Sequence, residues 1–128
     1  MWQERVLAAA EPTAQGRQVV TTAAAVAAEC RLPLHVVIVI ASAEERPKSD
    51  AFLREALDLA QRRGVTVQGE VRMGKPFTEI LAAGVGCRAD LIVMGSRSDN
   101  RIGRALVGGV AQKVMGLAEI PVMVLNLH

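Results

Sequence analysis

The stretch LHVVIVIA, from Leu34 to Ala41, decides the fold class of this chain. Apart from His35 it is a continuous apolar run rich in β-branched residues, without the polar alternation of a half-buried strand. Such a run is typical of a strand buried on both faces, as in a parallel sheet covered by helices. We therefore expect helical segments on either side of it.

The segments before and after this strand have the expected patterns. Arg5–Ala10 is a short apolar run closed by the breaker cluster EPT, and Gln15–Glu29 carries apolar residues at helical spacing. After the strand comes the polar loop SAEERPKSD, in which Ser49 or Asp50 can cap a helix that ends at Gly64.

The second half of the chain continues the alternation. VTVQGEVR (65–72) predicts a strand near a sheet edge, and Pro76 marks the start of a helix. ADLIVMG (89–95) predicts a fourth strand, which is followed by a helix over Val110, Val114 and Leu117. IPVMVLNL (120–127) predicts the fifth strand.

Five strands separated by four helical stretches predict right-handed β-α-β crossovers. The expected fold is therefore α/β, a five-stranded parallel sheet with helices on both faces, as one domain over residues 1–128.

The composition of the chain argues against some classes of binding partner. Hydrophobic residues make up 51% of the chain and aromatic residues 2%, and the formal net charge is only +2. These values argue against a nucleic-acid partner, which would call for a basic surface or stacking aromatics. The apolar runs are too short to cross a bilayer and the N-terminus does not resemble a secretory signal, so we expect a soluble, cytoplasmic protein with no membrane partner.

The reactive side chains do not form a recognisable catalytic or metal pattern. Cys30 and Cys87 lack metal-ligand spacing and are expected to be buried or half-buried thiols. His35 is expected to be structural, and Asp90 to be a turn or cap residue. Ser96 has no evident triad partners. We therefore predict no catalytic residue, no metal site and no enzymatic activity.

In parallel sheets, ligands bind beyond the carboxyl ends of the strands, where the strand order reverses. If the first strand is central, this point lies between EPT and the stretch VMGSRSDNRIGRALVGGVAQKV (93–114). A strand, a polar loop and a helix N-terminus in this order can form a phosphate cradle or a plain connection. Arg97, Arg101 and Arg104 can likewise neutralise a triphosphate or form a solvated loop.

The order of these motifs, with LHVV, GKP, ADLIVMGSRS, GGVAQKV and IPVMVL, resembles the universal stress protein family along essentially the whole chain. The resemblance implies the strand order 3-2-1-4-5, in a fold similar to that of the adenine nucleotide alpha hydrolases. It also implies a homodimer formed through the C-terminal strand, and ATP or another adenine nucleotide as ligand.

The family's nucleotide loop has the pattern glycine, two residues, glycine, nine residues, then Gly-Ser or Gly-Thr. Gly95 and Gly108 match it, whereas Ser98 replaces the second glycine and Gly109 the serine or threonine. The resemblance implies the following binding residues: Glu11 and Thr13 near the adenosine, Val39 at the adenine, and Met94, Gly95, Ser98, Gly108, Gly109 and Val110 at the ribose and phosphates.

The substitutions in this motif are expected to weaken nucleotide binding by the loop without abolishing it. Ser98 costs about 1 kcal/mol if its position needs the left-handed region, and one neutral hydrogen bond lost at Gly109 changes affinity up to about tenfold. Glu11 is one methylene longer than the family's aspartate. Two functions stay open: a regulatory domain that binds an adenine nucleotide weakly, and a homodimeric interaction module that has lost nucleotide binding.

Overall fold

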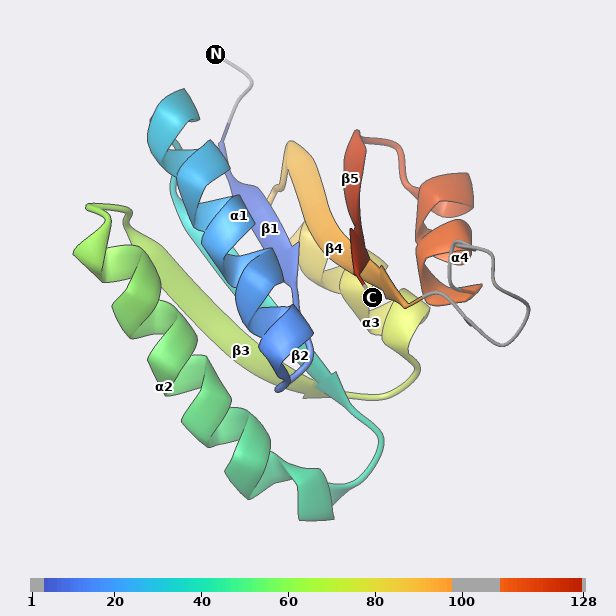
Figure 1. The fold of residues 1–128 in the computed structure, drawn as a ribbon. Helices are drawn as coiled ribbons and strands as arrows, with labels where there is room; N and C mark the ends of the chain where they lie inside the picture. Colours follow the sequence, from blue (N-terminus) through green and yellow to red (C-terminus); the bar gives the residue numbers. More distant parts are fainter. Residues whose placement is uncertain (1–3, 98–108, 128) are drawn as a thin grey trace.

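The computed structural model describes residues 4–97 and 109–127. Within these residues the chain forms one sheet (Figure 1). Its strands are β1 (Val6–Ala9), β2 (Leu34–Ile40), β3 (Val67–Met73), β4 (Leu91–Arg97) and β5 (Val122–Leu127).

Helices connect the strands. They are α1 (Ala14–Cys30), α2 (Arg46–Arg62), α3 (Pro76–Gly86) and α4 (Gly109–Leu117), and a short 3-10 turn, η1 (Ala43–Glu45), precedes α2. As predicted, α2 ends beside Gly64, whose φ of 78° lies in the left-handed region that glycine adopts without strain.

The strand order is β3-β2-β1-β4-β5, with all neighbours parallel. This arrangement confirms the predicted fold class, the strand order implied by the resemblance, and the edge position of β3. Figure 1 shows α1 and α2 on one face of the sheet and α3 on the opposite face, with α4 beside it.

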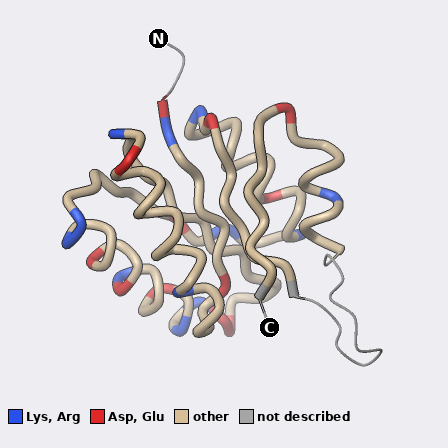
Figure 2. The backbone as a smooth tube through the Cα atoms, turned by 45° about the horizontal axis from the view of Figure 1, so that its top comes forward, with Lys and Arg blue, Asp and Glu red and all other residues tan. Residues whose placement is uncertain are grey.

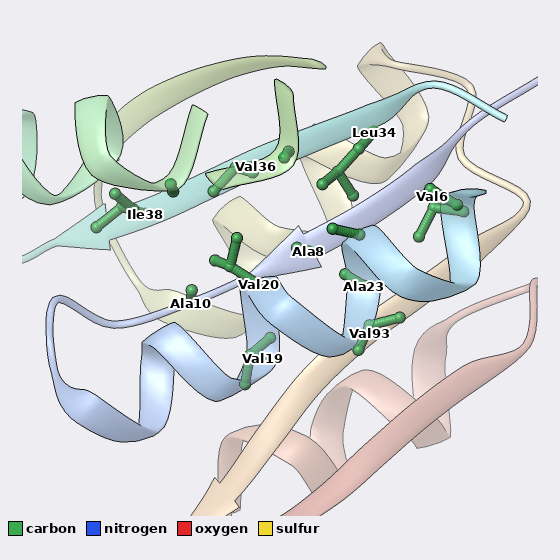
Figure 3. Close-up of a cluster of buried hydrophobic side chains, with 14 of the residues drawn as sticks. Val6, Ala8, Ala10, Val19, Val20, Ala23, Leu34, Val36, Ile38 and Val93 are labelled. Carbon is green, nitrogen blue, oxygen red and sulfur yellow. The ribbon is translucent and has the colours of Figure 1, made fainter. Parts of the chain in front are cut away.

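The core consists of two apolar layers, one on each face of the sheet. In β1, Val6 and Ala8 pack toward α1 and α2, whereas Leu7 and Ala9 pack toward α3 and α4. Figure 3 shows the first layer, in which Val19, Val20 and Ala23 of α1 meet the strands. Small alanines at the helix–sheet contacts let the backbones approach closely.

The start of α2 differs from the sequence prediction. The helix begins at Arg46, so that Ser49 and Asp50 lie inside it and neither caps it. Glu45 closes the preceding turn, where its carboxylate accepts hydrogen bonds from the backbone N–H groups of Ala41 and Ser42 at 2.8 and 2.9 Å. Pro47, interpreted as part of a loop, instead occupies the first helical turn, where its missing N–H has no cost.

The cysteines and the last helix also depart in part from expectation. Cys87 is half-buried, and burial raises the pKa of its thiol, but Cys30 is exposed at the C-terminal end of α1. In α4, Val114 is buried whereas Val110 and Leu117 are exposed, because the helix turns Ala111 and Val114 toward the sheet.

Charged residues occupy the helices and loops at the periphery, and the central strands are almost free of them (Figure 2). Among the described residues, no helix is both long and apolar enough to cross a membrane.

Ser49 provides a test of the packing of α2. The residue is 1% exposed, and its hydroxyl has no hydrogen-bond partner among the described residues. We expect Ser49→Ala to raise the free energy of unfolding by about 0.5–2 kcal/mol, since it removes an unsatisfied buried hydroxyl and improves helix propensity. Urea unfolding measures the change, with Lys48→Ala on the exposed face of α2 as the control. A loss of stability on Ser49→Ala would show that the hydroxyl is paired.

Candidate functional site

A pocket of about 300 Å³ lies at the carboxyl ends of the central strands β1 and β4. The chain leaves β1 toward α1 on one face and leaves β4 toward α4 on the other, so the connections diverge there. This is the switch point at which parallel sheets hold ligands. The pocket lies where the sequence placed a crevice.

The pocket brings together most of the residues singled out in the sequence. Seven of them line it: Glu11, Thr13, Val39, Met94, Gly95, Gly109 and Val110. Ser98, Gly108, Arg101 and Arg104 lie outside the described residues.

The turn from β1 to α1 forms one wall. Thr13 is the N-cap of α1, and its hydroxyl oxygen accepts a hydrogen bond from the N–H of Gly16 at 3.0 Å. The N–H of Thr13 donates to the carbonyl of Glu11 at 2.8 Å. Thr13 is therefore first a capping residue that orients the turn, and its O–H remains a possible donor.

Gly16 allows this turn to close. A Cβ built on it would lie 1.6 Å from the carbonyl oxygen of Glu11, so only glycine fits at this position. Sequence reasoning missed this residue, although a glycine in the first turn of an otherwise good helix is the signal that could have found it.

The inner wall of the pocket is apolar. Val37 and Val39 of β2 face Ile80 of α3, and Met94 of β4 lies beside them. Pro76 at the start of α3 completes this side. Such a lining suits a flat apolar group better than an ion.

The remaining wall combines the end of β4 with the start of α4. Gly95 and the buried Ser96 belong to β4, and Gly109 is the first residue of α4. The first backbone N–H groups of a helix lack intrahelical acceptors and carry a partial positive charge, so this wall can hold an anion.

The described lining has one charged side chain, that of Glu11. Among the described residues, no three His, Cys, Asp or Glu side chains lie close enough together to hold a metal ion. The described pocket thus offers an apolar slot, a carboxylate and helix-terminal amides, with no described lysine or arginine in its lining.

Comparison with known proteins shows to which family the chain belongs. A sequence model of the universal stress protein family matches residues 3–126. The chain belongs to the universal stress protein family. The resemblance in its motifs is thereby confirmed.

Curated universal stress proteins match it over shorter segments. One from Methanocaldococcus jannaschii is 36% identical over 74 residues, covering 58% of this chain and 44% of that protein. One from Thermus aquaticus is 33% identical over 90 residues, covering 60% of this chain and 66% of that protein. The chain therefore spans less than two thirds of the length of either relative.

Solved universal stress proteins share the fold over nearly the whole chain. An Archaeoglobus fulgidus protein has a TM-score of 0.83 at 21% identity, covering 97% of this chain and 98% of that one. A universal stress protein in complex with cAMP gives 0.80 at 21% identity over 98% of both chains. A universal stress protein from Archaeoglobus fulgidus in complex with dAMP gives a TM-score of 0.75 at 21% identity, covering 96% of this chain and 97% of that one.

Gly16 gives this member of the universal stress protein family a testable steric constraint. We expect Gly16→Ala to lower the free energy of unfolding by about 1–3 kcal/mol, because either the loop at Glu11 or helix α1 must move to make room for the added Cβ. Gly116→Ala in α4, where none of the described residues has an atom within 4 Å of an added Cβ, should be neutral or stabilising. Thermal or urea unfolding of both variants measures the contrast. Equal stability for the two would contradict the close approach at Gly16.

Proposed function

We propose that this protein is a non-enzymatic regulator that binds an adenine nucleotide in the pocket between β1 and β4. The observation that carries the proposal is the convergence of the β1–α1 turn, the end of β4 and the N-terminus of α4 on one cavity. Family membership and the cAMP and dAMP complexes of structurally similar proteins support it.

The walls of the pocket suggest how the ligand lies. The adenine ring occupies the apolar slot between Val39, Ile80 and Met94. The carboxylate of Glu11 accepts hydrogen bonds from ribose hydroxyls. The phosphates meet the N-terminus of α4 at Gly109, and the loop implied by the family motif, including Ser98 and Gly108, completes their binding.

Regulation without turnover is the better proposal for this lining. General acid–base catalysis needs a proton acceptor and a donor in reach of the reacting atoms. In the described lining, Glu11 is the one carboxylate, and no histidine, cysteine or lysine joins it. The protein would then respond to the nucleotide by changing its interactions.

The two edges of the sheet differ in a way that supports homodimerisation through β5. The edge strand β3 carries Glu70 and Arg72, which protect an edge from pairing. The edge strand β5 has the sequence VMVLNL, with no charge, and Met123 in it is 36% exposed. An uncharged edge strand is suited to pair with a second copy, and this holds also if nucleotide binding has been lost.

Calorimetric titration with ATP, AMP and cAMP tests the binding. We expect heat of binding at millimolar nucleotide, and we expect Val39→Glu to lower the affinity at least about tenfold, because a charge enters the apolar slot.

The double variant Ser98→Gly, Gly109→Ser should tighten binding at least about tenfold by restoring the family motif. An added Cβ at Gly109 has nothing within 4 Å among the described residues, so the serine has room.

Circular dichroism of each variant controls for folding. No heat with any of the three nucleotides would refute the proposal and favour the interaction module. Unchanged affinity in the double variant would place the nucleotide elsewhere.

Analytical ultracentrifugation tests the dimer. We expect a dimer for the wild type and a monomer for Met123→Lys, because the lysine puts charge on the β5 edge. Met73→Lys is the matched control, since Met73 is 47% exposed on the opposite edge strand. A monomeric wild type, or equal dissociation by both variants, would contradict an interface at β5.

A further inference from the structure

A series of hydrogen-bonded and ion-paired side chains runs across the sheet beside the pocket, on the face covered by α3. Nε2 of His35 lies 2.8 Å from Oε2 of Glu70, a guanidinium nitrogen of Arg72 lies 3.1 Å from Oε1 of Glu70, and Nε of Arg72 lies 2.8 Å from Oε1 of Glu79. These four side chains come from β2, β3 and α3, and none of them lines the pocket.

The paired side chains of β3 are in register with the strand residues of the pocket wall. In the β2–β3 ladder, Glu70 is paired with Val37 and Arg72 with Val39, the two β2 residues that line the apolar slot. At the other end, Glu79 lies in the first turns of α3, next to Ile80 and three residues after Pro76. Arg72 therefore joins the strand side of the slot to its helix side.

The start of α3 depends on such ties, because it lacks a side-chain cap. Its N-cap residue is Lys75, whose side chain makes no capping hydrogen bond. Side-chain contacts from β3 and α4 reach this turn instead. Arg72 binds Glu79 from the sheet, and Nζ of Lys113 from α4 lies 4.9 Å from the ring centroid of Phe77.

Gly74 provides the space for the tie to Glu79. Its φ is 155°, and a Cβ there would lie 2.7–3.0 Å from atoms of the Glu79 side chain. Its N–H donates to the carbonyl of Ile40 at 3.0 Å, which holds the end of β3 against β2. The backbone at this bend thus leaves room for the carboxylate that Arg72 binds.

The partial burial of these groups distinguishes them from ordinary surface pairs. The side chains of Arg72 and Glu79 are 32% and 22% exposed, whereas those of Arg62 and Asp58 on α2 are 79% and 56% exposed. Desolvation acts to raise the pKa of Glu70, but hydrogen bonds and charges from His35 and Arg72 outweigh it and lower that pKa. Pairs shielded in this way are screened less by solvent and salt.

We propose that Arg72 is a positioning residue for the pocket, which fixes the first turn of α3 and thereby the spacing of Pro76 and Ile80 from Val39. This inference rests on the proposed function, since it names what sets the width of the adenine slot. Lysine cannot replace Arg72, because a single ammonium on a flexible stem does not present the planar fork that binds two carboxylates at once.

The test uses Arg72→Met, which keeps an apolar stem and removes the charge, with Arg62→Met as the matched control on the exposed Arg62–Asp58 pair. Two quantities are measured: AMP affinity by calorimetry, and amide hydrogen exchange in the ligand-free protein. We expect Arg72→Met to weaken AMP binding about tenfold and to speed exchange at residues 79–83, while exchange in α1 and α2 stays unchanged. Glu79→Ala should reproduce both effects, and Arg62→Met neither.

The readouts separate the failure of this inference from the failure of the proposed function. If no nucleotide binds even the wild type, the proposed function fails, and exchange at α3 alone decides whether Arg72 positions the turn. Unchanged exchange at residues 79–83 overturns the inference. Faster exchange spread evenly over all helices overturns it too, because Arg72 would then serve general stability. Altered α3 exchange with unchanged AMP affinity in a binding-competent protein also overturns it.

Discussion

The structure depends on the complete burial of β1. Its four residues, Val6–Ala9, have both edges paired, to β2 and β4, and both faces covered by helices. A strand enclosed on four sides must be apolar, and VLAA meets this requirement. Asp90 holds the start of β1 by accepting hydrogen bonds from the N–H groups of Glu4 and Arg5. The pocket lies at the carboxyl end of β1, where the chain turns toward α1.

The pocket follows from how the chain leaves the buried strand. The turn after β1 is held by Thr13 and by the close contact between Gly16 and Glu11, both of which depend on backbone geometry. The opposite wall is held by side chains, through Arg72 and Glu79. One wall is thus fixed by steric exclusion and the other by charge pairing. Steric exclusion is insensitive to salt and pH, whereas charge pairing responds to both.

Much of this arrangement was predictable from the sequence, for a physical reason. A strand buried on both faces needs a nearly continuous apolar sequence, so LHVVIVIA and ADLIVMG predict strands. The order of the strands in turn predicts the position of the pocket. Features that depend on three-dimensional proximity left no local pattern. The contacts of Glu70 with His35 and of Arg72 with Glu79 join different segments of the chain. The cap at Glu45 lies within the polar stretch SAEERPKSD, whose composition, with Pro47, is typical of a loop.

In the proposed dimer, the contrast between the two sheet edges would limit how far copies of this chain assemble. Hydrogen bonding along a sheet is open-ended in principle, since every added strand exposes a new edge. Here an edge-to-edge pair formed at β5 would present only β3 at both ends, with Glu70 and Arg72 on each. Growth would stop at two copies, because the symmetric contact consumes the one receptive edge of each molecule. In the proposed dimer, the charges on β3 would thus keep sheet pairing from extending beyond two copies.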